Sequence, residues 1–218
     1  MTRSSQSRVK QRQRTHDDII AAAIELLRSG ATPSMAEIAE AARVSRRTLY
    51  LHFPTLDQLL TDAKIGLLSK QAVDAELELV DPGGDVEKRV TVMIDAIIEN
   101  ARATLPLGRS LIKLTIDTPA LPDTPRRGYR RVAWIEKALA PLRPELPARE
   151  FERLVSALAM VIGWEGLIVL ADIRALAPTD QQKTIVWTAR AILRAALETR
   201  KAPQKRAGKT IRQRSRGA

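Results

Sequence analysis

The sequence predicts an all-α protein. Its 218 residues are 44% hydrophobic but only 3% aromatic, so the core must be built mainly from Leu, Ile, Val and Ala. Apolar residues recur at helical spacing, and few segments show the two-residue alternation that is typical of strands. The clearest stripe lies in 86–104 and contains Val90, Met93, Ile94, Ile97, Ile98 and Ala101. The chain has no cysteine, which excludes disulfides, thiolate catalysis and zinc fingers, and is compatible with a reducing compartment.

The first two helices have clear start and stop signals. We expect a first helix over about 15–29, ended by Gly30, whose lack of a side chain suits a helix terminus. Ser34 and Glu37 form the S-x-x-E pattern of a capping box, so a second helix should begin at Met35.

A third short helix follows after a tight turn near Arg43. Ser45 is a good N-cap residue for this helix. Leu49 and Phe53 are four residues apart, so both can face inward from one side. Pro54 stops the third helix, and a fourth should run from a Thr cap to about residue 80.

The remaining chain is divided by glycine- and proline-rich segments at 81–85, 118–125 and 143–147. Between them we expect helices over about 86–104, 107–117, 126–142, 148–175 and 179–200. Residues 154–171 carry one charge, Glu165, and barely reach the length of a membrane span. A carboxylate near the centre of a lone span would be costly, so we expect a helix buried on two sides and no membrane association.

The positive charge of the chain is concentrated at its two ends. Residues 1–14 hold five basic groups and residues 200–218 hold eight, with no acid in either segment. Without these thirteen, 23 basic residues face 25 acidic ones, so the middle carries a charge of −2 despite the overall +11. Both ends are poor in apolar residues and are predicted to be flexible. They could simply aid solubility, or they could lie on nucleic-acid phosphates.

The third helix presents an unusual outward face. With Leu49 and Phe53 pointing inward, the residues left on the outside are Arg46, Arg47, Thr48, Leu51 and, in part, Tyr50 and His52. Arginines can fork onto guanine edges, hydroxyls can bind phosphates, and an apolar atom can meet a thymine methyl group. Each residue alone has an ordinary structural explanation, and Tyr50 and His52 could fill the seam between helices. Their combination on one face beside a basic arm favours DNA reading.

The string VSRRTLYLHF, preceded by EIAEAA and by an amphipathic helix ending at Gly30, resembles the N-terminal domain of the TetR family of transcriptional regulators. The similarity covers about residues 15–64. Two positions depart from the family pattern. Arg43 stands where the turn usually has Gly, and Leu56 stands where the next helix usually has a phosphate-binding Lys.

The resemblance implies a domain organisation and a function. It implies a basic flexible arm over 1–14, a helix-turn-helix DNA-binding domain over 15–64, a larger helical ligand-binding and dimerisation domain over 65–199, and a basic disordered tail over 200–218. It also implies a cytoplasmic homodimer, acting as a repressor, that a small-molecule ligand of unknown identity releases from DNA. A two-fold dimer requires a palindromic operator on double-stranded DNA, with half-sites roughly 34–36 Å apart.

Candidate contacts can be assigned on this basis. Base readers would be Arg46, Arg47 and the apolar Leu51, with Ser45 capping their helix. Phosphate contacts would come from Ser34, Thr48, Tyr50 and His52, and from the arm residues Lys10, Arg12 and Arg14. The expected dimer interface contains Val161, Trp164, Ile168, Trp187, Ala191 and Ala195. The expected ligand pocket is lined by Met93, Ile97, Trp134, Met160, Trp164 and Glu165. Glu165 would meet a cationic ligand or, more commonly, an interior arginine such as Arg109 or Arg190.

Other functions are less well supported by the residues. Only two histidines occur, His16 and His52, and no hydrolase, metalloprotease, P-loop or dinucleotide motif is present, so we expect neither an enzyme nor a cofactor nor a metal site. A non-specific DNA-organising protein that binds through its basic tails is the main alternative. RNA binding is least favoured, because the sequence lacks a platform of exposed aromatic residues.

Overall fold

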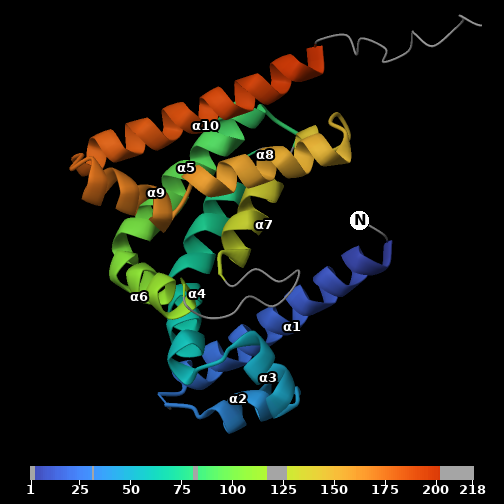
Figure 1. The fold of residues 1–218 in the computed structure, drawn as a ribbon, viewed down its shortest axis with the longest axis vertical. Helices are drawn as coiled ribbons and strands as arrows, with labels where there is room; N and C mark the ends of the chain where they lie inside the picture. Colours follow the sequence, from blue (N-terminus) through green and yellow to red (C-terminus); the bar gives the residue numbers. More distant parts are fainter. Residues whose placement is uncertain (1–2, 31, 81–82, 117–126, 202–218) are drawn as a thin grey trace, which may run out of the picture.

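The computed structural model describes residues 3–30, 32–80, 83–116 and 127–201, and all regular structure within these ranges is helical. This confirms the predicted fold class. In Figure 1 a small unit built from α1, α2 and α3 lies at one end of the molecule, α8 and α10 lie at the other, and α4 connects them.

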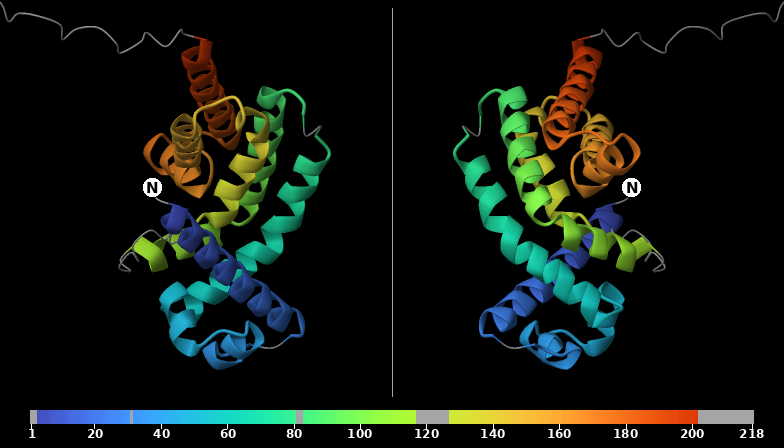
Figure 2. Two further views of the ribbon diagram at one scale, coloured as in Figure 1. Left: turned by 90° about the vertical axis from the view of Figure 1, so that its right-hand side faces the viewer. Right: turned by 90° about the vertical axis from the view of Figure 1, so that its left-hand side faces the viewer.

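The small unit forms around its own hydrophobic cluster. It contains α1 (Arg3–Arg28), α2 (Met35–Ala41), α3 (Arg46–His52) and the first half of α4 (Leu56–Glu78). Figure 2 shows α1 crossing α4 in both views. The buried residues of this unit are Ile19, Ile20, Ala23, Ile38, Ala39, Leu49, Phe53, Leu59 and Ala63. The predicted inward residues of α3, Leu49 and Phe53, are therefore in the core as expected.

Helix α1 begins earlier than the sequence predicted. It starts at Arg3 rather than near Thr15, so residues 3–14, which were expected to form a flexible arm, are the first turns of α1. This segment is rich in Arg and Gln, which are good helix formers, and it contains neither Pro nor Gly. Residues 15–28 form a helix that is stabilised by packing, and nothing in residues 3–14 prevents this helix from extending toward the N-terminus.

The larger unit packs around a second cluster, formed by residues of α4, α5, α7, α8 and α10. Its helices are α5 (Val86–Ala103), α6 (Leu105–Ile116), α7 (Tyr129–Ala138), α8 (Ala148–Val161), α9 (Trp164–Ile168) and α10 (Pro178–Lys201), with a 3₁₀ turn at Ala140–Leu142. Every residue of the predicted stripe in α5 is buried. Arg89, also buried on α5, donates to the carbonyl oxygens of Lys137 (2.7 Å) and Ala138 (3.1 Å), which ties the end of α7 to α5.

The predicted long helix over 148–175 is broken. After α8, Ile162 has extended backbone and Gly163 has φ +126°, a conformation that side chains other than glycine rarely adopt. The chain then resumes in α9 and a π-helical turn at Val169–Ile173. No single described helix is long and apolar enough to cross a membrane. Ala148–Val161 and Trp164–Ile173 reach that length together, but they are bent by 41° at the break.

Two smaller differences concern helix ends. The helix expected at 107–117 begins two residues earlier, and the one expected at 126–142 is α7 followed by the 3₁₀ turn, since Pro141 cannot donate a backbone hydrogen bond. The loop predicted at 118–125 and nearly all of the basic tail at 200–218 lie outside the described residues.

Candidate nucleic-acid interface and ligand cleft

Helices α2 and α3 each begin at a side-chain N-cap, and the turn between them is closed by backbone hydrogen bonds from the N–H groups of Arg43 and Val44 to the carbonyl oxygens of Glu40 and Ala39, both at 3.0 Å. The Ser34 side chain accepts from the Glu37 backbone N–H, and the Glu37 carboxylate accepts from the Ser34 N–H at 2.8 Å, which completes the predicted capping box. Ser45 Oγ accepts from the Thr48 backbone N–H at 3.0 Å, so Ser45 is the N-cap of α3 as predicted. Between the two helices Arg43 adopts φ +54°, as the missing glycine required. Helix α3 is therefore a rigid element in a defined orientation.

The outer face of α3 is open to solvent. Arg46 and Arg47 are exposed, and neither guanidinium forms an ion pair with any residue in the described part of the chain. Tyr50 and Leu51 are also exposed, by 51% and 50%. Thr48 is half-buried, and its hydroxyl lies 2.8 Å from Ser45 Oγ. Two unpaired guanidinium groups beside an aromatic and an aliphatic side chain can contact both base edges and phosphates.

His52 does not belong to this outer face. It is half-buried, its ring centroid lies 6.3 Å from that of His16 on α1, and its Nδ1 is buried without a hydrogen-bond partner. Burial lowers the pKa of His52, and the nearby His16 and Arg12 lower it further. His52 thus packs against His16 of α1, and a neutral, half-buried ring is poorly suited to the predicted phosphate contact.

The other residues predicted to contact phosphates differ in how available they are to DNA. Arg12 and Arg14 are exposed on α1, whereas the side chain of Lys10 lies outside the described part of the structure. Ser34 is exposed, but its hydroxyl donates to Glu37 at 2.7 Å, so its proton is already used within the capping box.

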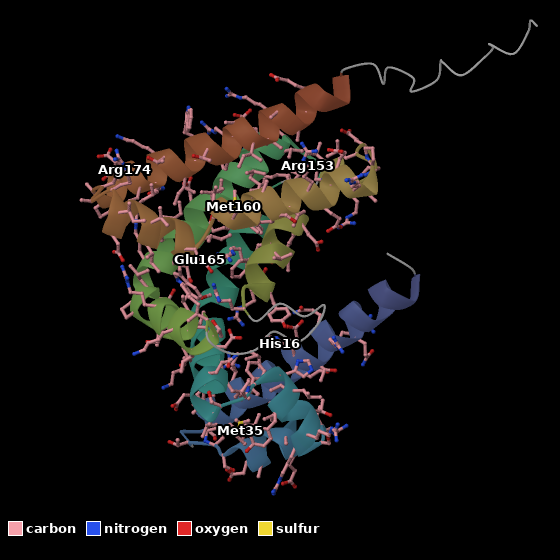
Figure 3. The ribbon with its side chains drawn as sticks, in the orientation of Figure 1. His16, Met35, Arg153, Met160, Glu165 and Arg174 are labelled. Atoms are coloured by element: carbon pink, nitrogen blue, oxygen red, sulfur yellow. The ribbon has the colours of Figure 1, made fainter. Side chains whose placement is uncertain are left out.

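A buried polar cluster joins the small unit to the larger one. Asp62 on α4 is 5% exposed and accepts a hydrogen bond from Arg130 on α7. Its other oxygen lies 3.5 Å from Nε2 of His16, which is 3% exposed on α1. The ring of Tyr129 stacks on His16 with a centroid distance of 4.0 Å. Figure 3 shows His16 where α1 passes the start of α7. Three helices from two units thus meet at one ion-paired contact.

The charges of this cluster are mutually stabilised. Burial lowers the pKa of His16, but hydrogen bonds and charge from Asp17 and Asp62 outweigh burial, so the pKa is raised above 6.5. Burial raises the pKa of Asp62, but His16 and Arg130 outweigh it and the pKa lies below 3.8. Burial and the neighbouring carboxylates raise the pKa of Tyr129 to about 12, so the phenol stays neutral.

A narrow cleft adjoins this cluster beneath the start of α7. About 630 Å³ of empty space lies within and in front of the cleft, and part of that volume is open solvent. Four of the residues predicted to bind ligand line it, namely Ile97, Trp134, Trp164 and Glu165. The other two, Met93 and Met160, do not line it. Met93 is fully buried in the core, and Met160, labelled in Figure 3, is 74% exposed on α8.

Glu165 is held by arginines other than those expected. Its two carboxylate oxygens accept from Arg127 Nε at 3.1 Å and from Arg131 Nη1 at 2.5 Å. Burial raises the pKa of Glu165, but the two guanidinium groups outweigh it and lower the pKa to about 2. Arg109 pairs with Asp172, and Arg190 with Glu87. Glu165 thus pairs with arginines of its own chain, as expected, but these are Arg127 and Arg131 and not Arg109 or Arg190.

The predicted dimer interface is split by the break at Gly163. Trp187 is 71% exposed on α10, and Ala191 and Ala195 are exposed beside it. Trp164 instead packs within its own chain, with its indole N–H donating to Thr104 Oγ1 at 3.3 Å. Val161 and Ile168 are half-buried. The chain changes direction at Gly163, and Trp164 after the break packs inward. Residues before and after the break therefore do not share one outer face, as the predicted interface assumed.

Sequence reasoning missed the residues that join the two units. Asp62, Arg127, Arg130 and Arg131 were not singled out from the sequence. The signal available was the run RRGYRR at 126–131, where four arginines flank a glycine at a helix start. No group of three or more His, Cys, Asp or Glu residues in the described part of the chain could hold a metal ion.

Comparisons with known proteins agree with the geometry of the small unit. Residues 19–63 match the family model of bacterial regulatory proteins, tetR family, which confirms the resemblance over the helix-turn-helix. No curated protein matches the chain. A solved TetR transcriptional regulator from Rhodococcus sp. RHA1 is 21% identical, with a TM-score of 0.48 over 84% of this chain and 97% of that chain. A solved tetR family transcription regulator from Shewanella sp. PV-4 is also 21% identical, with a TM-score of 0.34 over 85% and 97%.

Proposed function

We propose that this protein is a sequence-specific DNA-binding transcription regulator that acts as a repressor, since residues 19–63 match the model of bacterial regulatory proteins of the tetR family. In this proposal residues 15–64 read DNA, and residues 65–199 bind ligand and form the dimer. That the protein represses transcription, and does not activate it, follows from the family resemblance alone.

The observation that carries the proposal is the outer face of α3. Arg46 and Arg47 are exposed and without an ion-pair partner in the described chain, on a helix whose N-terminus is capped by the Ser45 side chain and whose preceding turn is closed by backbone hydrogen bonds. Exposed arginines are common on protein surfaces and alone do not indicate a function. Here, however, they lie on a rigid helix, which can enter a major groove without reorganising. Each bidentate contact from Arg to guanine contributes roughly 1–3 kcal/mol of discrimination between bases.

A homodimer would pair two such reading helices. The exposed apolar residues that favour a subunit interface lie on α8, on the turn after α9 and on α10, and are Met160, Val169, Ile173 and Trp187. In Figure 1, α8 and α10 lie at the end of the molecule opposite to α3. A two-fold axis through that end would leave both reading helices free and would require a palindromic operator.

Release by a ligand is supported by the position of the cleft. The cleft is lined by His16 and Asp62 from the small unit as well as by residues of α5, α7 and α9. A molecule that fills it would contact both units at once. For such a ligand to release DNA, it must bind better to the arrangement that cannot read the operator.

Selection from random DNA tests the proposed function. The full chain should enrich a palindrome, and Arg46→Ala and Arg47→Ala should each relax preference at particular base pairs. Arg28→Ala is the matched control, since Arg28 is an exposed arginine at the end of α1 that pairs with Glu25. Enrichment of no palindrome, together with loss of binding when residues 202–218 are removed, would support the non-specific DNA-organising alternative.

A further inference from the structure

The cleft beneath α7 has an excess of positive charge at one end. Glu165 is a single carboxylate shared between two guanidinium groups, those of Arg127 and Arg131. Asp62, the other acid that lines the cleft, is already paired with Arg130 and faces His16. Three arginines therefore line the cleft against two carboxylates, and the uncompensated charge lies beside Glu165.

Arg131 has unused hydrogen-bonding capacity at this end. Its Nη1 donates to the Ile162 carbonyl oxygen at 3.0 Å and to Glu165, but its Nε is buried and has no hydrogen-bond partner. An arginine offers five N–H donors, and a buried donor without a partner is unfavourable. Two glycines that line the cleft, Gly128 and Gly163, leave room for the guanidinium. A Cβ at Gly163 would lie only 2.0 Å from Arg131 Nη1.

The start of α7 adds to the positive potential. Its N-cap residue is Gly128, which lines the cleft and provides no side-chain cap to the first turn of this ten-residue helix. The positive end of the helix dipole is therefore directed at the same region as Arg131.

The other walls of the cleft are apolar. Trp134 and Trp164 line it together with Ile97 and Leu111. Both indole N–H groups are already engaged, that of Trp134 with Asp74 at 3.0 Å and that of Trp164 with Thr104 at 3.3 Å. The two rings therefore present hydrocarbon, and not donors, to a molecule in the cleft.

We propose that this cleft binds a small amphipathic organic acid, whose carboxylate contacts Arg131 and Arg127 and whose apolar body lies against Trp134 and Trp164. A cationic ligand is disfavoured, because Glu165 is already neutralised by two arginines. The proposal names the chemistry of the ligand in the proposed function and so rests on it. Binding of the acid can nevertheless be measured without DNA.

The test is isothermal titration of the full chain with three eight-carbon probes that differ only in the head group: octanoate, octanamide and octylammonium. Octanoate should bind at least tenfold more tightly than octanamide, since charge-assisted hydrogen bonds are stronger than neutral ones. Octylammonium should bind most weakly. Equal affinity for octanoate and octanamide, preference for octylammonium, or no binding of any probe at millimolar concentration would overturn the proposal.

Substitutions at Arg131 and Glu165 test whether the carboxylate of octanoate binds at this end of the cleft. Arg131→Gln should lower octanoate affinity about tenfold and change octanamide affinity less than about twofold. Glu165→Gln should act in the opposite direction and tighten octanoate binding, because it removes the competing carboxylate. Arg153→Gln, a control at an exposed position on α8, should change neither. A loss of octanoate affinity in both cleft variants, or an equal loss in the control, would contradict the assignment.

A final measurement, of DNA release by octanoate, distinguishes failure of this proposal from failure of the proposed function. If octanoate binds with the expected charge preference but does not release DNA, the acid site stands and the ligand-release mechanism fails. If DNA is read but no charge preference is found, the regulator stands and the acid site fails.

Discussion

The contact between the two units depends on one buried carboxylate, and we predict that Asp62→Asn weakens it measurably. Asp62 on α4 accepts from Arg130 on α7 and faces His16 on α1. The asparagine retains the shape and one acceptor oxygen but removes the charge. The substitution therefore tests the electrostatic contribution without creating a cavity.

The expected loss can be estimated from the two contacts. A hydrogen bond to a charged group contributes about 1.5–3 kcal/mol, against about 0.5–1.5 kcal/mol for a neutral one. Two weakened contacts would lower the free energy of unfolding by about 2–3 kcal/mol. Part of this is offset because the buried charge no longer has to be desolvated, which leaves a net loss of about 2 kcal/mol.

The loss should also depend on pH, through His16. Its pKa is raised in the folded protein, so its contribution to stability is fully present below 6.5 and disappears as the pH rises through the raised value. In Asp62→Asn, burial lowers the pKa of His16, and among the neighbouring carboxylates only Asp17 still opposes it. Arg12, His52 and the neutral Tyr129 do not restore the lost charge. The destabilisation should therefore be larger near about pH 6 than near about pH 8.

Urea unfolding at these two pH values measures both effects. Asp18→Asn is the control, since Asp18 is exposed on α1 and should change stability by less than about 0.5 kcal/mol. Wild-type stability in Asp62→Asn, or an equal loss at both pH values, would refute the assignment of His16 and Asp62 as a charged pair.

Three further predictions concern the turn, the cap and the proposed interface. Arg43→Gly should raise the free energy of unfolding by about 0.5–1 kcal/mol, because it relieves a positive φ; a loss in urea unfolding would argue against strain there. Ser45→Ala should cost about 1 kcal/mol in the same assay and weaken DNA binding, since α3 loses its cap; an unchanged midpoint would contradict this. Trp187→Glu should shift the protein from dimer to monomer in sedimentation equilibrium, and an unchanged mass would place the interface elsewhere.

Local signals were sufficient to predict the small unit. The Ser34 box, the Ser45 cap and the pair Leu49 and Phe53 each act within one helical turn, so the sequence alone determines them. The positive φ at Arg43 was predictable through the family resemblance, because Arg43 stands where the turn usually has Gly.

Contacts between distant segments could not be predicted in the same way. Periodicity suggested one continuous helix through Gly163, since a single glycine in an apolar run is compatible with either a helix or a break. The break forms where Arg131, from another helix, occupies the space beside Gly163. Likewise, nothing near Asp62 in the sequence shows that Arg130, 68 residues away, becomes its partner.

The central claim is that the two free guanidinium groups of α3 read base sequence, and fluorescence anisotropy with the selected operator and a scrambled duplex tests it most directly. For wild type the ratio of the two affinities should be large. Arg47→Ala should reduce this ratio by roughly 5- to 150-fold, the equivalent of one bidentate base contact, while Arg28→Ala leaves it unchanged. If Arg47→Ala and Arg28→Ala weaken binding to both duplexes equally, the arginines contact only phosphates and the claim is contradicted.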